Sequence, residues 1–284
     1  MVRGESVRLE ADAQTLARVA DRLRKAGCVF AEDEARILVS SAVDDAELEA
    51  MAARRASGIP LEHVVGWAAF CGLRIAVDPG VFVPRPRTEF LARQAIAVTP
   101  PHAVVVDLCC GAGAVGAAVA SATGAAEVYA VDIDPKAAAC ARKNLGPAAR
   151  VYVGDLYAPL PPCLRGRVDV LVCNAPYVPS DSLSLMPREA RLYEPRIALD
   201  GGADGLDVQR RVAAAAALWL SPGASLVFET SERQAPGSER ILKDAGLDAR
   251  IVRDEDRDAT VAIGTRTGHD RAIRPASQPG ATDA

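Results

Sequence analysis

The chain has 284 residues, half of them apolar, which is enough for one large domain or two smaller ones with a sizeable core. Its formal net charge of −4 gives no broad basic field, so we expect no stable nucleic-acid binding. None of the seven cysteines has Cys-x-x-Cys or zinc-site spacing, so we expect no metal and a reducing, cytoplasmic location. No apolar run is long enough to span a membrane, and the charged N-terminus has no signal-peptide core, so we expect no membrane association.

The first segment carries helical patterns only. Apolar residues recur at helical spacing over 16–23. Asp44 followed by Glu47 has the form of a capping box, which opens a helix that must end near Gly58-Ile59-Pro60. We therefore expect a small helical domain over residues 1–60.

After residue 60 the apolar residues no longer recur at helical spacing. From 61 to 90, β-prone residues alternate with the turn residues Gly66, Gly72 and Asp78-Pro79-Gly80. This pattern predicts a hairpin that links two domains.

Strand and helix patterns then alternate along the chain. Continuous apolar runs of this kind are typical of a parallel sheet with helices on both faces, so the predicted fold class for 91–266 is an open, doubly wound α/β sheet. The polar tail, 267–284, lacks apolar periodicity and is expected to be disordered. The runs expected to form strands are 104–110, 127–133, 150–154, 168–174 and 224–231, with a closing pair at 249–254 and 259–266.

A glycine-containing turn follows the first strand, with the sequence DLCCGAGAVG over 107–116, and an alanine-rich helix is expected over 114–122. Glycines in such a turn let a ligand approach the free amides at the start of the helix. Glycines also occur in turns for backbone reasons alone, so this signal needs support from other residues.

Two of the three acids that follow the strands supply that support. Asp132 ends the second strand and is placed to accept hydrogen bonds from both hydroxyls of a ribose. Asp134 precedes Pro135 and is better explained as the N-cap of the next helix. Asp155 ends the third strand, where it could meet the amino group of an adenine, or be a plain loop carboxylate. Together these features predict an adenosine-bearing ligand at the carboxyl ends of the strands.

A polar tetrad, Asn174-Ala175-Pro176-Tyr177, ends the fourth strand. Although the glycine turn satisfies the spacing of a dinucleotide site, this tetrad has no role in hydride transfer. The Asn174 side-chain oxygen and the carbonyl of residue 175 offer two hydrogen-bond acceptors, and the Tyr177 ring offers a flat apolar surface beside them.

Seven blocks stand in a fixed order along the chain: GIPLEHVVGWAAFCGLRIAV (58–77), VFVPRPRTE (81–89), DLCCGAGAVG (107–116), GDLY (154–157), NAPYVP (174–179), YEPRIALDGGADGLD (193–207) and FETSERQ (228–234). In these blocks the chain resembles the HemK/PrmC family of S-adenosylmethionine-dependent protein-(glutamine-N5) methyltransferases. The resemblance implies a class I (Rossmann-like) methyltransferase sheet, with a small N-terminal helical domain for substrate recognition and a hairpin linker. It also implies S-adenosyl-L-methionine as the cofactor.

The resemblance extends to the site residues, with departures. It places Arg85, Pro86 and Thr88-Glu89 beside the cofactor, whereas Arg87 stands where the family prefers an acid and could simply belong to a stiff linker. Ala175 stands where the family usually has proline, which removes stiffness but keeps the carbonyl. Glu194 is expected to brace the loop after the tetrad. The predicted catalytic residues are Asn174, Ala175, Pro176 and Tyr177, and the predicted cofactor-binding residues are Asp107, Cys109, Cys110, Gly111, Ala112, Gly113, Asp132, Ile133, Asp155, Leu156 and Asn174.

The function that the resemblance implies is methyl transfer to the side-chain amide of a glutamine in a protein. An amide nitrogen is a poor nucleophile because its lone pair is delocalised, so a catalyst must hold it in line with the methyl donor. The Asn174 side-chain oxygen and the carbonyl of residue 175 can accept from its NH₂ group, while the Tyr177 ring packs on the amide plane. For the family, the implied substrates are peptide chain release factors carrying Gly-Gly-Gln, and we expect a monomer. One alternative is methylation of a nucleic-acid base amino group, which the local cluster Arg188, Arg191 and Arg196 keeps open. Another is a non-catalytic S-adenosylmethionine-binding interaction protein, which the intact Asn174 and Tyr177 disfavour.

Overall fold

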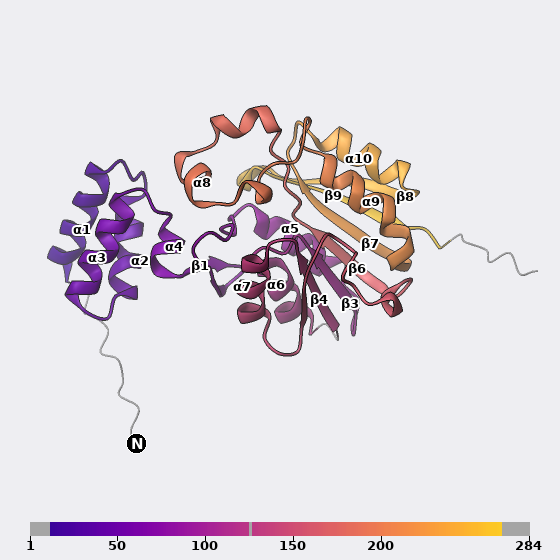
Figure 1. Ribbon diagram of the computed structural model, residues 1–284, viewed down its shortest axis with the longest axis horizontal. Helices are drawn as coiled ribbons and strands as arrows, with labels where there is room; N and C mark the ends of the chain where they lie inside the picture. The colour runs from indigo at the N-terminus through magenta and orange to yellow at the C-terminus, as the bar shows by residue number, and fades with distance from the viewer. Residues whose placement is uncertain (1–11, 125–126, 269–284) are drawn as a thin grey trace, which may run out of the picture.

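The computed structural model describes residues 12–124 and 127–268 (Figure 1). The expected disordered tail over 267–284 falls almost entirely outside these residues. Among the residues described, no helix combines the length and apolar character that crossing a membrane requires.

Four helices form an N-terminal unit with its own core, in which Leu23, Leu38 and Leu48 are fully buried. The predicted cap is confirmed, because the Asp44 side chain accepts a hydrogen bond from the Glu47 amide at 2.8 Å. The Glu47 carboxylate returns to the amide of Val43 rather than to that of Asp44. The helices of this N-terminal unit are α1 (Ala13–Lys25), α2 (Ala31–Ser41), α3 (Asp45–Ala56) and α4 (Leu61–Val65).

A short antiparallel hairpin, β1 (Trp67–Phe70) and β2 (Leu73–Ala76), follows this unit. The segment 61–90 therefore contains more than a hairpin, because it begins with α4 and ends in the first turn of α5 (Thr88–Ala97). The Glu89 carboxylate accepts a hydrogen bond from the Cys71 amide at 2.9 Å. This contact ties the hairpin turn to the start of α5.

The predicted sheet is confirmed as a seven-stranded, mostly parallel sheet in the order β5-β4-β3-β6-β7-β9-β8. Strands β3 to β7 run parallel, and β9 is antiparallel to both β7 and β8. The carboxyl ends of the parallel strands therefore meet at one edge, where open α/β sheets bind ligands. The strands are β3 (Val104–Leu108), β4 (Glu127–Asp132), β5 (Arg150–Val153), β6 (Val168–Cys173), β7 (Leu220–Thr230), β8 (Leu247–Asp254) and β9 (Ala259–Arg266).

Helices cover both faces of the sheet, as the continuous apolar strands require. Helices α5, α6 and α7 pack on one face, and α9 and α10 pack on the other (Figure 1). Each face has its own buried cluster, with Val105 and Val172 in one and Val106 and Leu171 in the other. The remaining α-helices of the sheet domain are α6 (Ala114–Thr123), α7 (Pro135–Leu145), α9 (Asp207–Trp219) and α10 (Ala235–Asp244).

A long connection between β6 and α9 carries the tetrad and then the helix α8 (Arg188–Tyr193). In Figure 1 this connection lies between the N-terminal unit and the sheet domain. Short 3₁₀ turns occupy Ser180–Leu185 and Arg196–Ala198 on either side of α8, and two others lie at Pro162–Leu164 and Glu255–Arg257. The connection thus places residues 186–200 over the carboxyl ends of the strands.

Candidate active site

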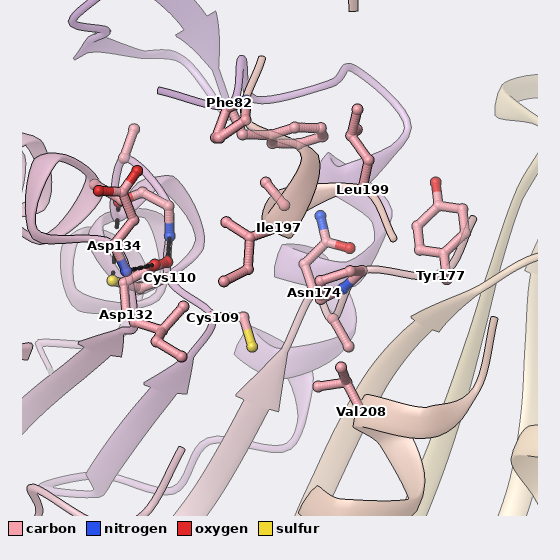
Figure 2. A pocket seen from close by; sticks show the side chains of 18 of the residues that line it. Phe82, Cys109, Cys110, Asp132, Asp134, Asn174, Tyr177, Ile197, Leu199 and Val208 are labelled. Carbon is pink, nitrogen blue, oxygen red and sulfur yellow. Dashed lines mark hydrogen bonds between the residues drawn. The ribbon is translucent and has the colours of Figure 1, made fainter. Parts of the chain in front are cut away.

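A cavity of about 250 Å³ opens at the carboxyl ends of the parallel strands. The glycine turn and Asp132 line one end, and the tetrad lines the other (Figure 2). Almost every site residue predicted from the sequence lines this one cavity: Asp107, Cys109, Cys110, Gly111, Ala112, Asp132, Ile133, Asp155, Leu156, Asn174, Ala175, Pro176 and Tyr177.

The glycine turn has the tight backbone that its sequence predicts. Cys109 and Gly111 both adopt positive φ, at 55° and 54°. The Gly111 amide donates to Asp132 Oδ2 at 2.8 Å, and the Gly116 amide donates to Asp107 Oδ2 at 2.9 Å. These two bonds join the turn, the end of β4 and the first turn of α6 into one rigid unit beside the cavity.

Gly113 does not line the cavity, unlike its predicted neighbours. Its φ is +76°, and a Cβ built on it would lie 3.0 Å from the Cβ of Ala141 and 3.2 Å from Leu145 Cδ1. The second glycine of the turn therefore lets α6 approach α7 closely. Its role in cofactor binding stays a prediction.

The three acids differ in their surroundings. Burial raises the pKa of Asp132, while the backbone amides of Asp134 and Gly111 oppose the shift. Asp134 is the N-cap of α7, as predicted, since its side chain accepts from the Lys136 amide at 2.9 Å. Asp155 faces the cavity but already pairs with Arg211, at 2.5 Å. A base amino group at this position would share the Asp155 carboxylate with a guanidinium.

The tetrad directs an amide and an aromatic ring toward the cavity (Figure 2). Asn174 Nδ2 donates to Thr88 Oγ1, over a long 3.4 Å. Ala175 is buried and packs with the apolar cluster under α9. The backbone carbonyl of Tyr177 accepts from Gln234 Nε2 at 2.9 Å, which anchors the end of the tetrad to the start of α10.

Two charged residues surround the Tyr177 hydroxyl, and the sequence pattern gave neither of them a role there. Arg87 donates to this hydroxyl and lies over the ring, with its guanidinium carbon 5.7 Å from the ring centroid. The hydroxyl donates to Glu229 Oε1 at 3.2 Å, and Arg87 Nε lies 3.5 Å from the same oxygen. Arg87 and Glu229 lie in two of the segments that carry the family resemblance, 81–89 and 228–234. Those segments were the only indication in the sequence that these residues belong to the site.

Apolar side chains close the opposite side of the cavity. Phe82, Ile197 and Leu199 lie across from Cys109 and Val208 in Figure 2. The sequence pattern did not select these residues, because each is unremarkable until the 180–200 connection folds over the sheet.

Glu194 braces this connection, as expected. It is buried, and it pairs with Arg85 at 2.5 Å and accepts a hydrogen bond from the Val83 amide at 3.4 Å. Burial raises its pKa, and the Arg85 charge opposes that shift.

Neither a metal site nor a reactive thiol stands out among the described residues of the site. Among residues 12–124 and 127–268, no group of three or more His, Cys, Asp or Glu side chains is arranged to hold a metal ion. Burial raises the pKa of the Cys110 thiol well above its usual value, so this side chain packs as a small apolar group.

Comparison with known proteins identifies the family. The sequence model described as "Methyltransferase small domain" matches residues 72–189. A release factor glutamine methyltransferase from Mycolicibacterium smegmatis is 45% identical over 196 residues, which cover 66% of this chain and 69% of that protein. The chain belongs to the release factor glutamine methyltransferase family.

Further matches agree with this assignment. The protein of the same name from Geobacter sulfurreducens is 39% identical over 188 residues, and the match spans 65% of each chain, just under two thirds of that relative's length. In fold, a methyltransferase from Pyrococcus furiosus aligns with a TM-score of 0.53 at 16% identity, covering 69% of this chain and 90% of that chain. Methyltransferases of this family use S-adenosylmethionine as the methyl donor.

Proposed function

We propose that this protein transfers a methyl group from S-adenosylmethionine to the side-chain amide nitrogen of a glutamine in a peptide chain release factor. The observation that carries the proposal is that the Asn174 to Tyr177 tetrad lines the same cavity as Asp132 and the glycine turn. One cavity can therefore hold a nucleoside at one end and present an amide acceptor at the other.

The residues at the first end fit the cofactor. Asp132 offers carboxylate lone pairs to ribose hydroxyls, and Ile133 and Leu156 offer apolar contact to a base. The Asp107 carboxylate suits an ammonium group, and the turn amides can donate to a carboxylate. When bound, S-adenosylmethionine supplies the transferable methyl group on a positively charged sulfonium.

The residues at the other end fit a primary amide. Asn174 Oδ1 and the carbonyl of Ala175 would accept from the two NH₂ hydrogens of the substrate, which holds its nitrogen in line for attack. The Tyr177 ring would pack on the amide plane. Orientation of the amide nitrogen is the main contribution required, because the proton that leaves the product can pass to water.

The surface beside the cavity favours a protein substrate. Leu185 and Leu192 are 83% and 59% exposed, and both flank the cavity-lining part of the 180–200 connection. In the predicted basic cluster, Arg191 donates to the Met186 carbonyl and Arg196 pairs with Asp200 at 3.0 Å. The ion pair with Asp200 reduces the charge that Arg196 can offer to a nucleic-acid phosphate.

We also propose that the N-terminal unit of helices α1 to α4 takes part in recognising the substrate, since it lies beside α8 (Figure 1). Seven free thiols suit a reducing compartment, and a cytoplasmic monomer is the form that we propose.

The test combines methyl transfer with cofactor binding. The purified protein is incubated with isotopically labelled S-adenosylmethionine and a release factor, in parallel with a release factor in which the glutamine of Gly-Gly-Gln is replaced. Asn174→Ala is compared with the unchanged protein in the same assay. We expect label only on the unchanged release factor, and a loss of about 100-fold or more in the variant, with cofactor affinity within about twofold.

The other outcomes separate the alternatives. Label on nucleic acid in a lysate, removed by nuclease and not by protease, contradicts the proposal in favour of base methylation. Cofactor binding without label on any fraction contradicts it in favour of a non-catalytic protein. Equal loss of cofactor affinity and transfer in Asn174→Ala shows that this residue serves the cofactor or the fold instead of the amide.

A further inference from the structure

Glu229 is a buried acid that has no proposed contact with either the cofactor or the substrate amide. It lies near the end of β7, its residue is 4% exposed, and its Oε1 accepts the Tyr177 hydroxyl at 3.2 Å. Its second oxygen, Oε2, has no hydrogen-bond partner within the described part of the chain. A buried carboxylate with unused lone pairs is costly unless a neighbour donates to it.

Thr88 is the neighbour that can donate. It is only 3% exposed, so its hydroxyl has little access to solvent, and its oxygen already accepts from Asn174 Nδ2. The hydroxyl proton must then go to an acceptor, and the Glu229 carboxylate lies beside it. The Thr88 hydroxyl is close enough to act on Glu229, whose pKa it lowers against the larger opposite effect of burial.

The donors therefore run in one direction, from the Asn174 amide to the Thr88 hydroxyl and then to Glu229. In this order Asn174 Nδ2 donates to Thr88, so Asn174 Oδ1 faces the cavity as a hydrogen-bond acceptor. If the amide were reversed, its oxygen would take the Thr88 proton and the buried Glu229 would lose a donor. The arrangement thus selects the amide orientation in which an acceptor faces the substrate.

The same carboxylate holds the other end of the tetrad. The Tyr177 hydroxyl donates to Glu229 and accepts from Arg87, which fixes the ring by a bond on each side. Arg87 also supplies a positive charge 3.5 Å from Glu229 Oε1.

We propose that Glu229 is a positioning residue, which orients the Asn174 amide through Thr88 and the Tyr177 ring through its hydroxyl. Its effect on catalysis rests on the proposed function, but its effect on the orientation of Asn174 does not. One experiment can therefore test the arrangement without any methyl transfer.

The sequence makes this experiment simple, because its only asparagines are Asn144 and Asn174. Protein labelled with ¹⁵N-asparagine gives two side-chain NH₂ signal pairs. Asn144 is the internal reference, since its Nδ2 donates to the Ala76 and Ala112 carbonyls at 2.9 and 2.8 Å, away from Glu229. We expect Thr88→Val to shift the Asn174 pair, Thr88→Ser to leave it near its original position, and Glu229→Gln to shift it without direct contact.

Kinetics on the release factor then measure the consequence. We expect Glu229→Gln and Thr88→Val each to lower kcat by about 10- to 100-fold, with rescue in Thr88→Ser. In Glu229→Gln, S-adenosylmethionine affinity should stay within about twofold. An Asn174 pair that stays in place in Glu229→Gln overturns the inference, and so does an equal shift of both asparagine pairs. An unchanged protein that fails to methylate the release factor overturns the proposed function alone, because the signal shifts are read separately.

Discussion

Arg55 in α3 donates a hydrogen bond of 2.7 Å to Glu189 in α8, which lies 134 positions later in the chain. The same guanidinium holds Glu34 of α2 through Nε at 2.6 Å. One buried cation therefore joins the N-terminal unit to the connection that covers the cavity. A movement of the N-terminal unit when it binds a partner could therefore move the 180–200 connection, which lines the active site.

Arg55→Met should destabilise the protein by about 3 kcal/mol, because removal of a buried cation leaves the buried Glu34 unpaired. The Arg55 side chain is 8% exposed and that of Glu34 is 13% exposed, whereas that of Glu189 is 44% exposed. Glu189→Gln is the matched control, with an expected loss of less than about 1 kcal/mol. Urea unfolding followed by circular dichroism measures both, and equal effects in the two variants would show that the pair with Glu34 contributes little.

Gly113→Ala should destabilise the protein by about 3 kcal/mol, which combines the cost of positive φ with a collision between α6 and α7. Gly124 is the control, because it also has positive φ, at +58°, but an added Cβ there meets nothing within 4 Å. For Gly124→Ala only the backbone cost of about 1 kcal/mol is expected. Thermal or urea unfolding gives the difference, and its absence would mean that α7 moves aside freely.

Cofactor affinity should rise with pH through Asp107. Burial raises its pKa to about 7, the nearby Asp132 charge adds to the shift, and the Gly116 amide opposes it. The carboxyl must lose its proton to attract a cationic ligand, so we expect S-adenosylmethionine to bind about eightfold tighter at pH 7.5 than at pH 6. Calorimetry at both pH values tests this, with Asp107→Asn as the control for titration of the ligand itself. The same slope in the variant would assign the effect to other groups.

The stability of the unliganded protein should change with pH in the opposite direction. The folded-state pKa of Asp107 is about 7, above its ordinary value of 3.8, so between these values the native state holds a proton that the unfolded chain has lost. This group therefore reduces stability as pH rises from about 4 to about 7. Asp107→Asn should flatten the curve of unfolding free energy against pH over that window, and an unchanged curve would contradict the assignment.

Ala175→Pro should stabilise the protein by about 0.5–1 kcal/mol, because proline restricts the unfolded chain and leaves the residue's carbonyl in place. Ala175 follows the last residue of β6, Cys173, by two positions, so the substitution removes no ladder hydrogen bond. Methyl transfer should stay within about twofold. Ala175→Gly is the opposite control and should lose about 1 kcal/mol. A loss of activity in Ala175→Pro would mean that the present backbone at this position is itself required.

Much of the fold could be predicted from the sequence, because the period of apolar residues changes where helices and strands alternate. The strand that precedes Asn174 and the acid at the end of β4 were both located in this way. The start of β7 was not, since Pro222-Gly223 is typical of a turn, whereas the strand already begins at Leu220. Local sequence could not show that this segment joins the ladder beside β6.

Some residues of the site could likewise be predicted from the sequence, and others could not. Asp132 and Asn174 follow apolar strands, and that local pattern suffices to place them at the edge of the sheet. The meeting of Thr88, Tyr177 and Glu229 could not be predicted, because it depends on the packing of α5 against β7 and on the path of the tetrad between them. For Gly113 the spacing in the sequence suggests contact with a ligand. The structure shows in addition that this glycine allows α6 to pack closely on α7, which the local sequence could not reveal.

The strand order also determines which parts of the molecule could join to another chain by backbone pairing. The two outermost strands are β5, which has only four residues, and β8, which exposes the charged side chains of Asp248, Arg250 and Arg253. Short or charged borders of this kind oppose the addition of further strands. The folded sheet is thus protected against edge-to-edge addition, which favours recognition of an incoming protein through side chains rather than by extension of this sheet.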